Sequence, residues 1–322
     1  MPRPYVIIDR MKRLLTIGML ALSLGARAQF DAAFTNSWAL QSFYNPAAAG
    51  LDAKLDVHGG MSMQMMGFEG APKVMLINAD MPLVFLGPKH GVGGAFLKDD
   101  IGPFSTKKVQ VQYAFHQPFL GGRISAGIRP ALLMENFDGS EIDLEESSDP
   151  VFASNEIKGM AFDLDVGIRY SYKKLWYAGV SAVHLLGPTI KLGESKTNQV
   201  KIDPTFYAQG GYNLRFRYPR YMLAMDALLR TDLQNWRGDI NARLLYNGEK
   251  HKLYGGIIYS PTNSVGAMVG FDFHGINIGY SYEFYTGGIG ALNGSHEIII
   301  GYQHDLDMSK KGKNLHKSVR LL

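Results

Sequence analysis

The sequence predicts an all-β protein, an antiparallel transmembrane β-barrel of the outer-membrane type with about 14 strands. Apolar and polar residues alternate over many runs of nine residues or more. Soluble strands usually have about 5–6 residues, whereas a tilted membrane strand needs about 9–11. The connections between the runs differ systematically in length, and the chain begins with an export signal. These three observations together favour a membrane barrel over a soluble sandwich.

The N-terminal segment 1–28 is predicted to be a signal peptide. Basic residues precede an apolar run over 14–24, and Ala26-Arg27-Ala28 then supplies a small-residue cleavage site. The apolar run is too short for a membrane anchor, which needs about 20 residues. Cleavage after Ala28 would leave a chain that begins at Gln29, and Met11 is as good a start for the signal as Met1.

Period-two alternation defines the strands. In 161–171, Phe162 and Leu164 alternate with Asp163 and Asp165, so one face is apolar and the other polar. The same reading places strands near 54–66, 73–81, 91–98, 106–117, 123–135, 160–171, 175–185, 204–216, 221–231, 238–246, 252–259, 264–273, 275–284 and 295–306. The barrel is therefore expected over 53–307.

The connections support membrane topology. Those after even-numbered strands are tight, at 118–122, 172–174, 247–250 and 274–275, whereas those after odd-numbered strands tend to be longer, at 136–159, 186–203 and 285–294. Short periplasmic turns and long extracellular loops are typical of outer-membrane barrels. The last strand should pair with the first, because hydrocarbon offers an open sheet edge no hydrogen-bond partner.

Composition excludes several classes of protein. The 322 residues contain no cysteine, so disulfides and thiolate sites are excluded. The net charge of +4 is too weak to indicate nucleic-acid binding. No catalytic constellation is visible within the strand pattern. We therefore expect no enzyme, no cofactor and no metal.

Short motifs run in order along the chain. They are Asn45-Pro46-Ala47-x-Ala49-Gly50 at the end of a lead-in over 29–52, Gly70-Ala71-Pro72, Asp80-Met81-Pro82, Gly91-Val92-Gly93-Gly94, Asp99-Asp100-Ile101-Gly102, Trp176-Tyr177-Ala178-Gly179-Val180-Ser181 with His184-Leu185, and His296-Glu297-Ile298. In this order the chain resembles the PorP/SprF family of type IX secretion-system outer-membrane proteins. The tract 64–69 departs from the Arg-x-x-Trp that the family often has, which puts any family role of that hairpin in doubt.

The resemblance implies an outer-membrane protein that works with type IX machinery, including periplasmic ring components. It implies support for secretion or surface attachment of cargo with a C-terminal sorting domain, and in some members a role in gliding. The resemblance carries no catalytic residues. Two alternatives remain open: a channel or transporter for small or apolar solutes, and a barrel-embedded enzyme. The lead-in is expected either in the periplasm or inserted in the lumen.

Two charged segments are candidate partner-binding sites. The acidic loop contains Asp138, Glu141, Asp143, Glu145, Glu146 and Asp149, and the basic tail over 308–322 contains Lys310, Lys311 and Lys313. The loop could dock a basic partner or chelate Ca²⁺, although its spacing matches no EF-hand. The tail could dock an acidic periplasmic component. The plain alternatives are a solvated loop and a solubilising end.

Several charged residues are predicted to face the lumen: Arg123, Arg129, Glu135, Asp163, Asp165 and Arg169. They could line a channel. Alternatively, they could pair with one another across the lumen, because side chains fill the interior of a small barrel. His58 and His116 share that inward face, with no serine–histidine arrangement evident from the pattern.

Overall fold

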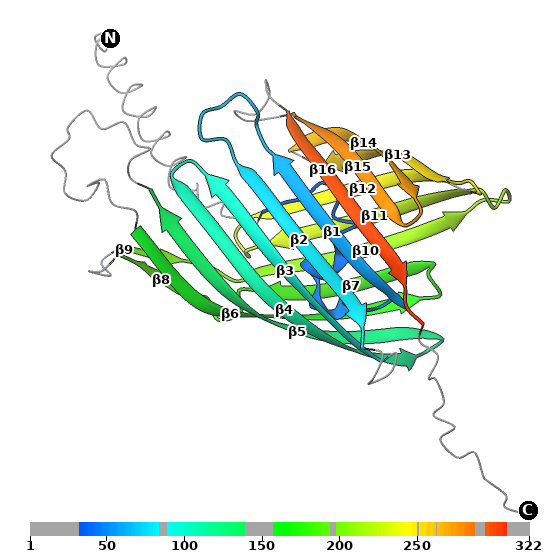
Figure 1. Cartoon of the computed structure of the whole chain (residues 1–322), viewed down its shortest axis with the longest axis horizontal. Coiled ribbons are helices and arrows are strands. Elements are labelled where there is room, and N and C mark those ends of the chain that lie inside the picture. Colours follow the sequence, from blue (N-terminus) through cyan, green and yellow to red (C-terminus); the bar gives the residue numbers. More distant parts are fainter. Residues whose placement is uncertain are drawn as a thin grey trace, which may run out of the picture. The chain divides into compact units, whose positions relative to one another are not determined.

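In the computed structural model the described residues are 32–83, 89–138, 157–193, 198–249, 251–261, 263–286 and 294–307. Fourteen of the described strands form a closed antiparallel barrel (Figure 1). They are β1 (Lys54–Met63), β2 (Lys73–Pro82), β3 (His90–Ile101), β4 (Phe104–Phe119), β5 (Gly122–Phe137), β6 (Ile157–Tyr172), β7 (Trp176–Val183), β10 (Thr205–Arg215), β11 (Tyr221–Thr231), β12 (Trp236–Asn247), β13 (His251–Ser260), β14 (Ser264–Phe273), β15 (Ile276–Tyr285) and β16 (Ser295–Asp305). The predicted fold class is confirmed.

The barrel closes where β1 pairs with β16, from Lys54 opposite Asp305 to Met63 opposite His296. Every other pair joins strands that follow each other in the chain, except that β7 pairs with β10 across a small hairpin. Closure leaves the barrel wall no unpaired edge strand, as hydrocarbon requires. No helix among the described residues is long and apolar enough to cross a membrane.

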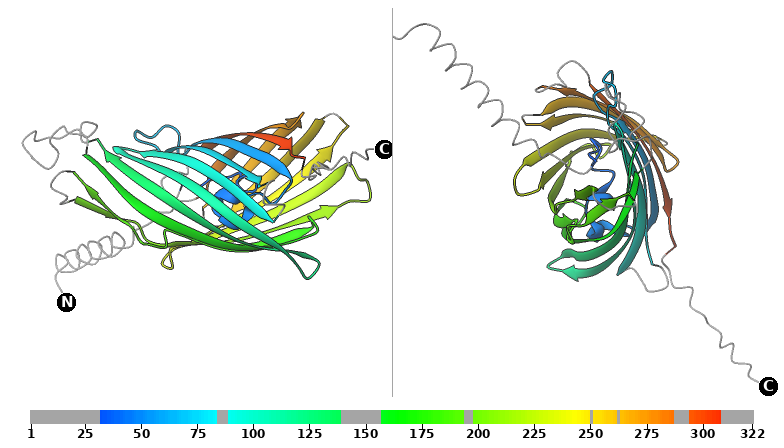
Figure 2. Two further views of the ribbon diagram at one scale, coloured as in Figure 1. Left: turned by 60° about the horizontal axis from the view of Figure 1, so that its bottom comes forward. Right: turned by 90° about the vertical axis from the view of Figure 1, so that its left-hand side faces the viewer.

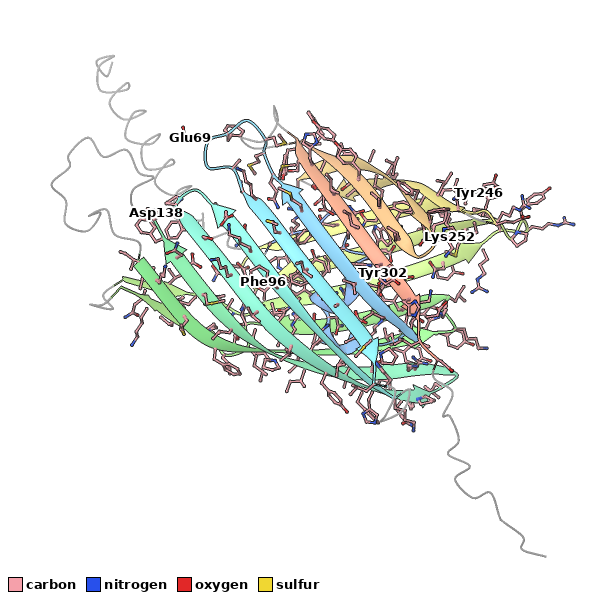
Figure 3. All side chains as sticks on the ribbon, in the orientation of Figure 1. Glu69, Phe96, Asp138, Tyr246, Lys252 and Tyr302 are labelled. Carbon is pink, nitrogen blue, oxygen red and sulfur yellow. The ribbon has the colours of Figure 1, made fainter. Side chains whose placement is uncertain are left out.

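Side chains alternate between lipid and lumen as predicted. On β6, Phe162 and Ile168 are exposed on the outer face, while Asp163 and Asp165 are fully buried on the inner face. Phe96 on β3 is likewise exposed on the outer surface (Figure 3). An apolar outer band around a polar interior is the arrangement of a barrel in a bilayer.

The connections sort by end. At the end where β1 begins and β16 ends they span 83–89, 120–121, 173–175, 216–220, 248–250 and 274–275. At the other end, four are long, over 64–72, 138–156, 184–204 and 286–294, but three are tight, over 102–103, 232–235 and 261–263. The predicted asymmetry is thus only a tendency. Following it, we call the first end periplasmic and the second extracellular.

Two features at the extracellular end differ from the predicted strands. β4, β5 and β6 have 16 residues each and reach two or three residues beyond the predicted ranges at this end, and one or two beyond them at the other end. The predicted loop 186–203 contains a hairpin of β8 (Thr189–Leu192) and β9 (Asn198–Lys201). Strands of four residues are too short to show periodicity.

Candidate functional site: a plugged lumen with two mouths

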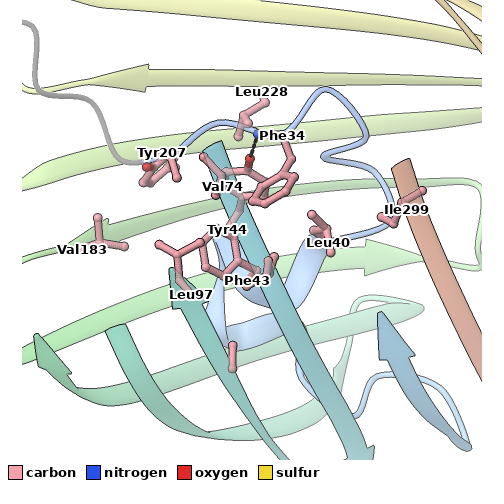
Figure 4. Packing of buried hydrophobic residues seen from close by; sticks show 13 residues of the cluster. Phe34, Leu40, Phe43, Tyr44, Val74, Leu97, Val183, Tyr207, Leu228 and Ile299 are labelled. Carbon is pink, nitrogen blue, oxygen red and sulfur yellow. Dashed lines mark hydrogen bonds between the residues drawn. The ribbon is translucent and has the colours of Figure 1, made fainter. Parts of the chain in front are cut away.

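The plug, defined as residues 32–53, lies inside the ring of strands (Figure 2). It contains the short helix α2 (Gln41–Tyr44) and the 3-10 turn η1 (Pro46–Ala48). Its apolar side chains, among them Phe34, Leu40, Phe43 and Tyr44, pack against inward residues of the wall (Figure 4). Those wall residues are Val74, Leu76, Ala95, Leu97, Val183, Tyr207, Leu228 and Ile299. The lead-in therefore occupies the lumen, one of the two locations that the sequence left open.

Asn45 joins the plug to the wall. Its side-chain nitrogen donates to the carbonyls of Ile168 and Val180, on neighbouring strands β6 and β7, at 3.2 Å each. Its side-chain oxygen accepts from the backbone N–H of Ala47 at 2.9 Å and so caps η1. The asparagine of the motif thus fixes the turn and its position at once.

Four wall glycines let the plug backbone come close. A Cβ atom at Gly167 would overlap the Asn45 side chain, one at Gly127 would overlap Pro46 and Ala47, and one at Gly91 would overlap the Ala49 carbonyl. A Cβ at Gly179 would lie 2.9 Å from the Asn45 nitrogen. We call Gly91, Gly127, Gly167 and Gly179 the glycine seam.

Asp80 ties both ends of this turn. One carboxylate oxygen accepts from Ser42 Oγ at 2.6 Å and the other from the backbone N–H of Gly50 at 2.8 Å. Gly50 has φ +65°, and a Cβ there would lie 2.6 Å from Gly91 Cα, so glycine is required on two grounds. The motif residues Asn45, Pro46, Gly50, Asp80 and Gly91 therefore meet at one place.

The remaining motif residues have other positions. Pro82 pairs with Gly91 at the end of β2, and Gly93 and Gly94 lie on β3 against its neighbouring strands. Gly70-Ala71-Pro72 lies in the 64–72 loop at the extracellular end, away from the seam. Gly127 and Gly167 of the seam were missed from sequence, because a glycine in a strand does not reveal what approaches it.

The start of the plug is held by what we call the carboxylate anchor, Glu283 and Glu297. Glu297 accepts from the backbone N–H groups of Thr35 at 2.6 Å and Asn36 at 2.8 Å, and from the Asn36 side chain at 2.7 Å. Glu283 accepts from Thr35 Oγ1 at 3.0 Å. Nearby, Tyr44 Oη accepts from the Phe34 N–H at 2.9 Å, and burial raises the pKa of Tyr44, so its phenol stays neutral.

Three of the six predicted inward charges form ion pairs, Arg129 with Asp165 and Asp163 with His184. Arg123, Glu135 and Arg169 bind neutral partners: the Leu51 carbonyl, Thr106, and Ser171 with Gln41. Arg129 Nε donates to Asp165 at 2.7 Å, and its Nη1 donates to the carbonyls of Ser42 at 3.2 Å and Phe43 at 2.5 Å at the end of α2. His184 binds Asp163 through its ring and Asp165 through its backbone N–H. Asp163, Asp165 and His184 converge closely enough to surround a cation. Arg129 and Lys108 both contact Asp165, at 2.7 and 3.4 Å, so two cations already offset the two carboxylates and the cluster fits an ion-pair network better than a metal site.

A serine–histidine pair that the sequence pattern did not reveal lies beneath the plug. His116 Nδ1 is 2.8 Å from Ser125 Oγ, and its Nε2 is 2.9 Å from the Ala49 carbonyl oxygen. A carbonyl only accepts, so Nε2 carries the proton and Nδ1 accepts from the serine. Both residues are 1% exposed. The pair holds Ala49 and leaves a substrate no access to the serine.

The periplasmic mouth is a vestibule of about 590 Å³ whose ceiling is the plug. Basic residues on its wall include Arg123, Arg169, Lys173 and Lys174. Arg169 stacks over the Tyr177 ring at 3.8 Å and is 4% exposed. Its Nη1 has no hydrogen-bond partner among the residues that the structure describes. Asp52, Asp56, Asp80 and Asp226 line the same vestibule, and Lys174 already binds Asp52 at 2.9 Å, so basic residues only modestly outnumber acidic ones.

The extracellular mouth carries a second hollow, the extracellular cleft, of about 670 Å³. The motif Gly70-Ala71-Pro72 and Asp138, the first carboxylate of the predicted acidic loop, both line it. The Gly102 N–H donates to the Gly70 carbonyl at 3.0 Å, which joins the 64–72 loop to the β3–β4 turn. Met66 and Phe68 are 44% and 40% exposed there. The cleft brings together two sites that the sequence predicted separately.

Other predicted sites lie outside the described residues. These are the signal peptide over 1–28, the loop carboxylates Glu141, Asp143, Glu145, Glu146 and Asp149, and the tail lysines Lys310, Lys311 and Lys313.

Solved structures show the same fold. The monoaromatic hydrocarbon channel CymD aligns with 86% of this chain and 95% of its own, at TM-score 0.50 and 11% identity. A Pseudomonas aeruginosa FadL homologue covers 82% of this chain and 93% of its own (TM-score 0.46, 11% identity). The Ralstonia pickettii toluene transporter TbuX covers 82% and 92% (TM-score 0.46, 11% identity). At this identity the likeness concerns the barrel alone.

No curated protein matches the chain in sequence. The family model of the type IX secretion system membrane protein PorP/SprF matches residues 26–302, which include the plug and nearly all of the barrel. With the closed outer-membrane-type barrel, this match places the protein in the outer membrane. The chain belongs to the PorP/SprF family of type IX secretion system membrane proteins.

Proposed function

We propose that this barrel supports secretion or surface anchoring of cargo proteins by binding them, and not by conducting solutes. The observation that carries the proposal is the plug. It is tied to β2 through Asp80, to β5 through Arg129, to β6 and β7 through Asn45 and to β16 through Glu297. A lumen blocked by the family's own motif residues suits a docking platform.

The extracellular cleft is the proposed cargo site. Met66 and Phe68 are apolar, exposed and located in a loop beyond the membrane strands. Exposed apolar groups rimmed by polar ones are typical of protein-binding surfaces. The rim of the cleft carries both signs of charge, Lys73 and Lys98 with Asp100 and Asp138, so a partner of complementary charge pattern would be selected. Where the cargo is a motility adhesin, the same docking would serve gliding.

The vestibule and the tail that follows β16 are the proposed machinery site. Basic residues modestly outnumber acidic ones on the vestibule wall, which favours an acidic segment of a periplasmic ring component there. The predicted basic residues Lys310, Lys311 and Lys313 follow β16, which ends at the same mouth. Outer-membrane lipid is the remaining expected partner, through the apolar outer band.

Affinity purification from native outer membranes tests the cargo site. We expect wild-type protein to retain a secreted protein with a C-terminal sorting domain, and the double variant M66S/F68S to lose most of it. Leu120→Ser is the control, because Leu120 is also apolar and is even more exposed, at 78%, but lies in a periplasmic turn. Equal retention by M66S/F68S and wild type would remove the cleft from the proposal.

A solute channel is the alternative, and one solved structure of similar fold is a monoaromatic hydrocarbon channel. The charged pairs along the lumen, such as Arg129 with Asp165 and Arg243 with Asp226, make a poor path for an apolar solute. Planar-bilayer recordings on purified barrel should therefore show no steady conductance. Conductance without any partner protein would favour the channel.

A further inference from the structure

The hairpin of β10 and β11 carries three arginines where the barrel wall ends on the periplasmic side. They are Arg215, the last residue of β10, and Arg217 and Arg220 in the turn that leads to β11, and we call them the arginine strip. All three side chains are exposed. The strip adjoins the vestibule, because Asn213 lines the vestibule two residues before Arg215 and donates from its side chain to the Lys174 carbonyl at 2.9 Å.

The two faces of β10 differ in chemistry at this end. Tyr212 and Leu214 are exposed on the outer face, in line with the lipid-facing residues of the barrel. A Cβ atom at Gly211 would instead meet the ring of Tyr177, which lines the vestibule, so the odd-numbered residues of β10 face inward. Arg215 therefore extends the inner face of the strand and is turned away from lipid.

The positive charge of the strip is only partly neutralised. Arg220 has one weak ion pair, at 3.4 Å from the exposed carboxylate of Glu249. The side chains of Arg215 and Arg217 make no hydrogen bond or ion pair with any residue in the described part of the chain. The remaining sequence of the connections at this end, 84–88 and 250, and the tail over 308–322 contain no aspartate or glutamate. The strip therefore keeps a net positive charge.

The neighbouring β12–β13 hairpin holds the strip in place. The Asn247 N–H donates to the Arg220 carbonyl at 2.6 Å, and the rings of Tyr221 and Tyr246 lie 5.3 Å apart (Figure 3). A surface that is already ordered loses little conformational entropy when a partner binds. The strip is thus a preorganised extension of the vestibule wall.

Strip and vestibule together fit an extended acidic chain. Within the vestibule Lys174 is already bound to Asp52 at 2.9 Å, so the strip supplies most of the charge that is free to select a partner. A lipid headgroup matches less well, because the lipid-facing side of β10 carries Tyr212 and Leu214. A folded acidic domain could contact the turn but could not enter a vestibule of about 590 Å³. An extended segment can do both.

We propose that an extended acidic segment of a periplasmic protein lies along the inner face of the β10–β11 hairpin and ends in the vestibule. Its carboxylates contact Arg215, Arg217 and Arg220. Charge matching of this kind speeds association and selects the partner. The inference rests on the proposed use of the vestibule as the machinery site, and it adds the surface by which the partner enters.

Fluorescence anisotropy of a labelled peptide of alternating glutamate and serine, with the full-length barrel in nanodiscs of neutral lipid, tests the proposal. The triple variant R215Q/R217Q/R220Q should bind the peptide about tenfold more weakly than wild type, because three exposed ion pairs are lost. The matched control K107Q/K191Q/K201Q removes the same charge from exposed positions at the extracellular end and should bind as wild type does. R215K/R217K/R220K should keep the wild-type affinity, and heat-shifted gel mobility verifies that every variant is folded.

Equal affinity of wild type and R215Q/R217Q/R220Q would overturn the inference. If K173Q/K174Q nevertheless binds the peptide more weakly, the vestibule alone holds the partner and the proposed machinery site stands. Loss of the wild-type advantage in nanodiscs of phosphatidylglycerol would assign the arginines to lipid headgroups and also overturn the inference. A wild-type barrel that does not bind the peptide would remove the acidic partner altogether, while cargo retention at the extracellular cleft is measured separately.

Discussion

The plug is fixed to the barrel in two chemically different ways. At the glycine seam, contact depends on the absence of side chains on the wall, and a single asparagine supplies the hydrogen bonds. At the carboxylate anchor, contact depends on two acidic side chains that collect N–H and hydroxyl donors from Thr35 and Asn36. At the seam, the fit depends on the shape of the wall backbone, so almost any added side chain should disrupt it. At the anchor, binding depends on the acidic groups, so a change in side-chain size should be tolerated better.

The largest effect is expected when a side chain is added to the glycine seam. Gly91→Val places methyl groups where the Ala49 carbonyl lies, and both partners are backbone. We expect a loss of at least about 3 kcal/mol in the free energy of unfolding, or an unseated plug that admits ions. Urea unfolding in detergent and bilayer conductance measure the two outcomes. Gly59→Val is the control, because the nearest atom to a Cβ there is 4.0 Å away; equal effects would contradict the seam.

Removing the hydrogen bonds of the seam without adding bulk should cost less. Asn45→Ala loses two bonds to wall carbonyls and the cap of η1, in a site with no exposure. We expect about 2–3 kcal/mol of destabilisation by urea unfolding. Asn45→Asp keeps the cap but not the two donated bonds, so an Asp variant as stable as wild type would show that only the cap matters.

The anchor should respond to loss of charge by a smaller amount. Glu297→Gln keeps one acceptor oxygen for Asn36 but presents an amide N–H₂ to the Thr35 N–H. We expect a destabilisation of about 1–2 kcal/mol and unchanged barrel closure. Limited proteolysis of residues 32–40 in folded barrels should accelerate in this variant and not in Asn213→Asp, a change at the periplasmic end. Equal rates would mean that Glu297 does not hold the plug.

The smallest effect should come from Ser125→Ala. It removes the donor to His116 Nδ1 but leaves the bond from Nε2 to Ala49. About 1 kcal/mol of stability should be lost, measured in the same urea series. The rate of ester hydrolysis should equal that of buffer alone for both the wild type and the variant. A hydrolytic rate that disappears with Ser125→Ala would instead make the pair catalytic.

The same contrast explains how far the sequence could predict the molecule. Alternation in 161–171 placed Asp163 and Asp165 correctly in the lumen, since the side-chain period of a strand depends on local residues alone. The Asn45–Gly50 motif indicated the plug side of the seam, but not the wall glycines that it contacts. Glu297 and Asn36 meet across 261 residues, and no local pattern in either segment predicts that contact.

The extracellular side was harder to predict for another reason. The β8–β9 hairpin and the tops of β4–β6 stand above the apolar band, where both faces of a strand can be polar and alternation disappears. The serine–histidine pair of Ser125 and His116 needed the register of β4 and β5, which the sequence did not specify. These sites depend on tertiary geometry, so only the folded chain reveals them.

The direction of the plug has a consequence for biogenesis. The chain runs from Ala33, beside Gln64 at the extracellular end, through the lumen to Lys54, where β1 begins at the periplasmic end. If the barrel closed first, the plug would have to enter through the lumen, and its polar groups would have to pass the polar side chains of the wall. We infer that β1 and β16 pair last, around a plug that is already folded. A barrel that closes in this order would leave its insertase with the plug already in the lumen.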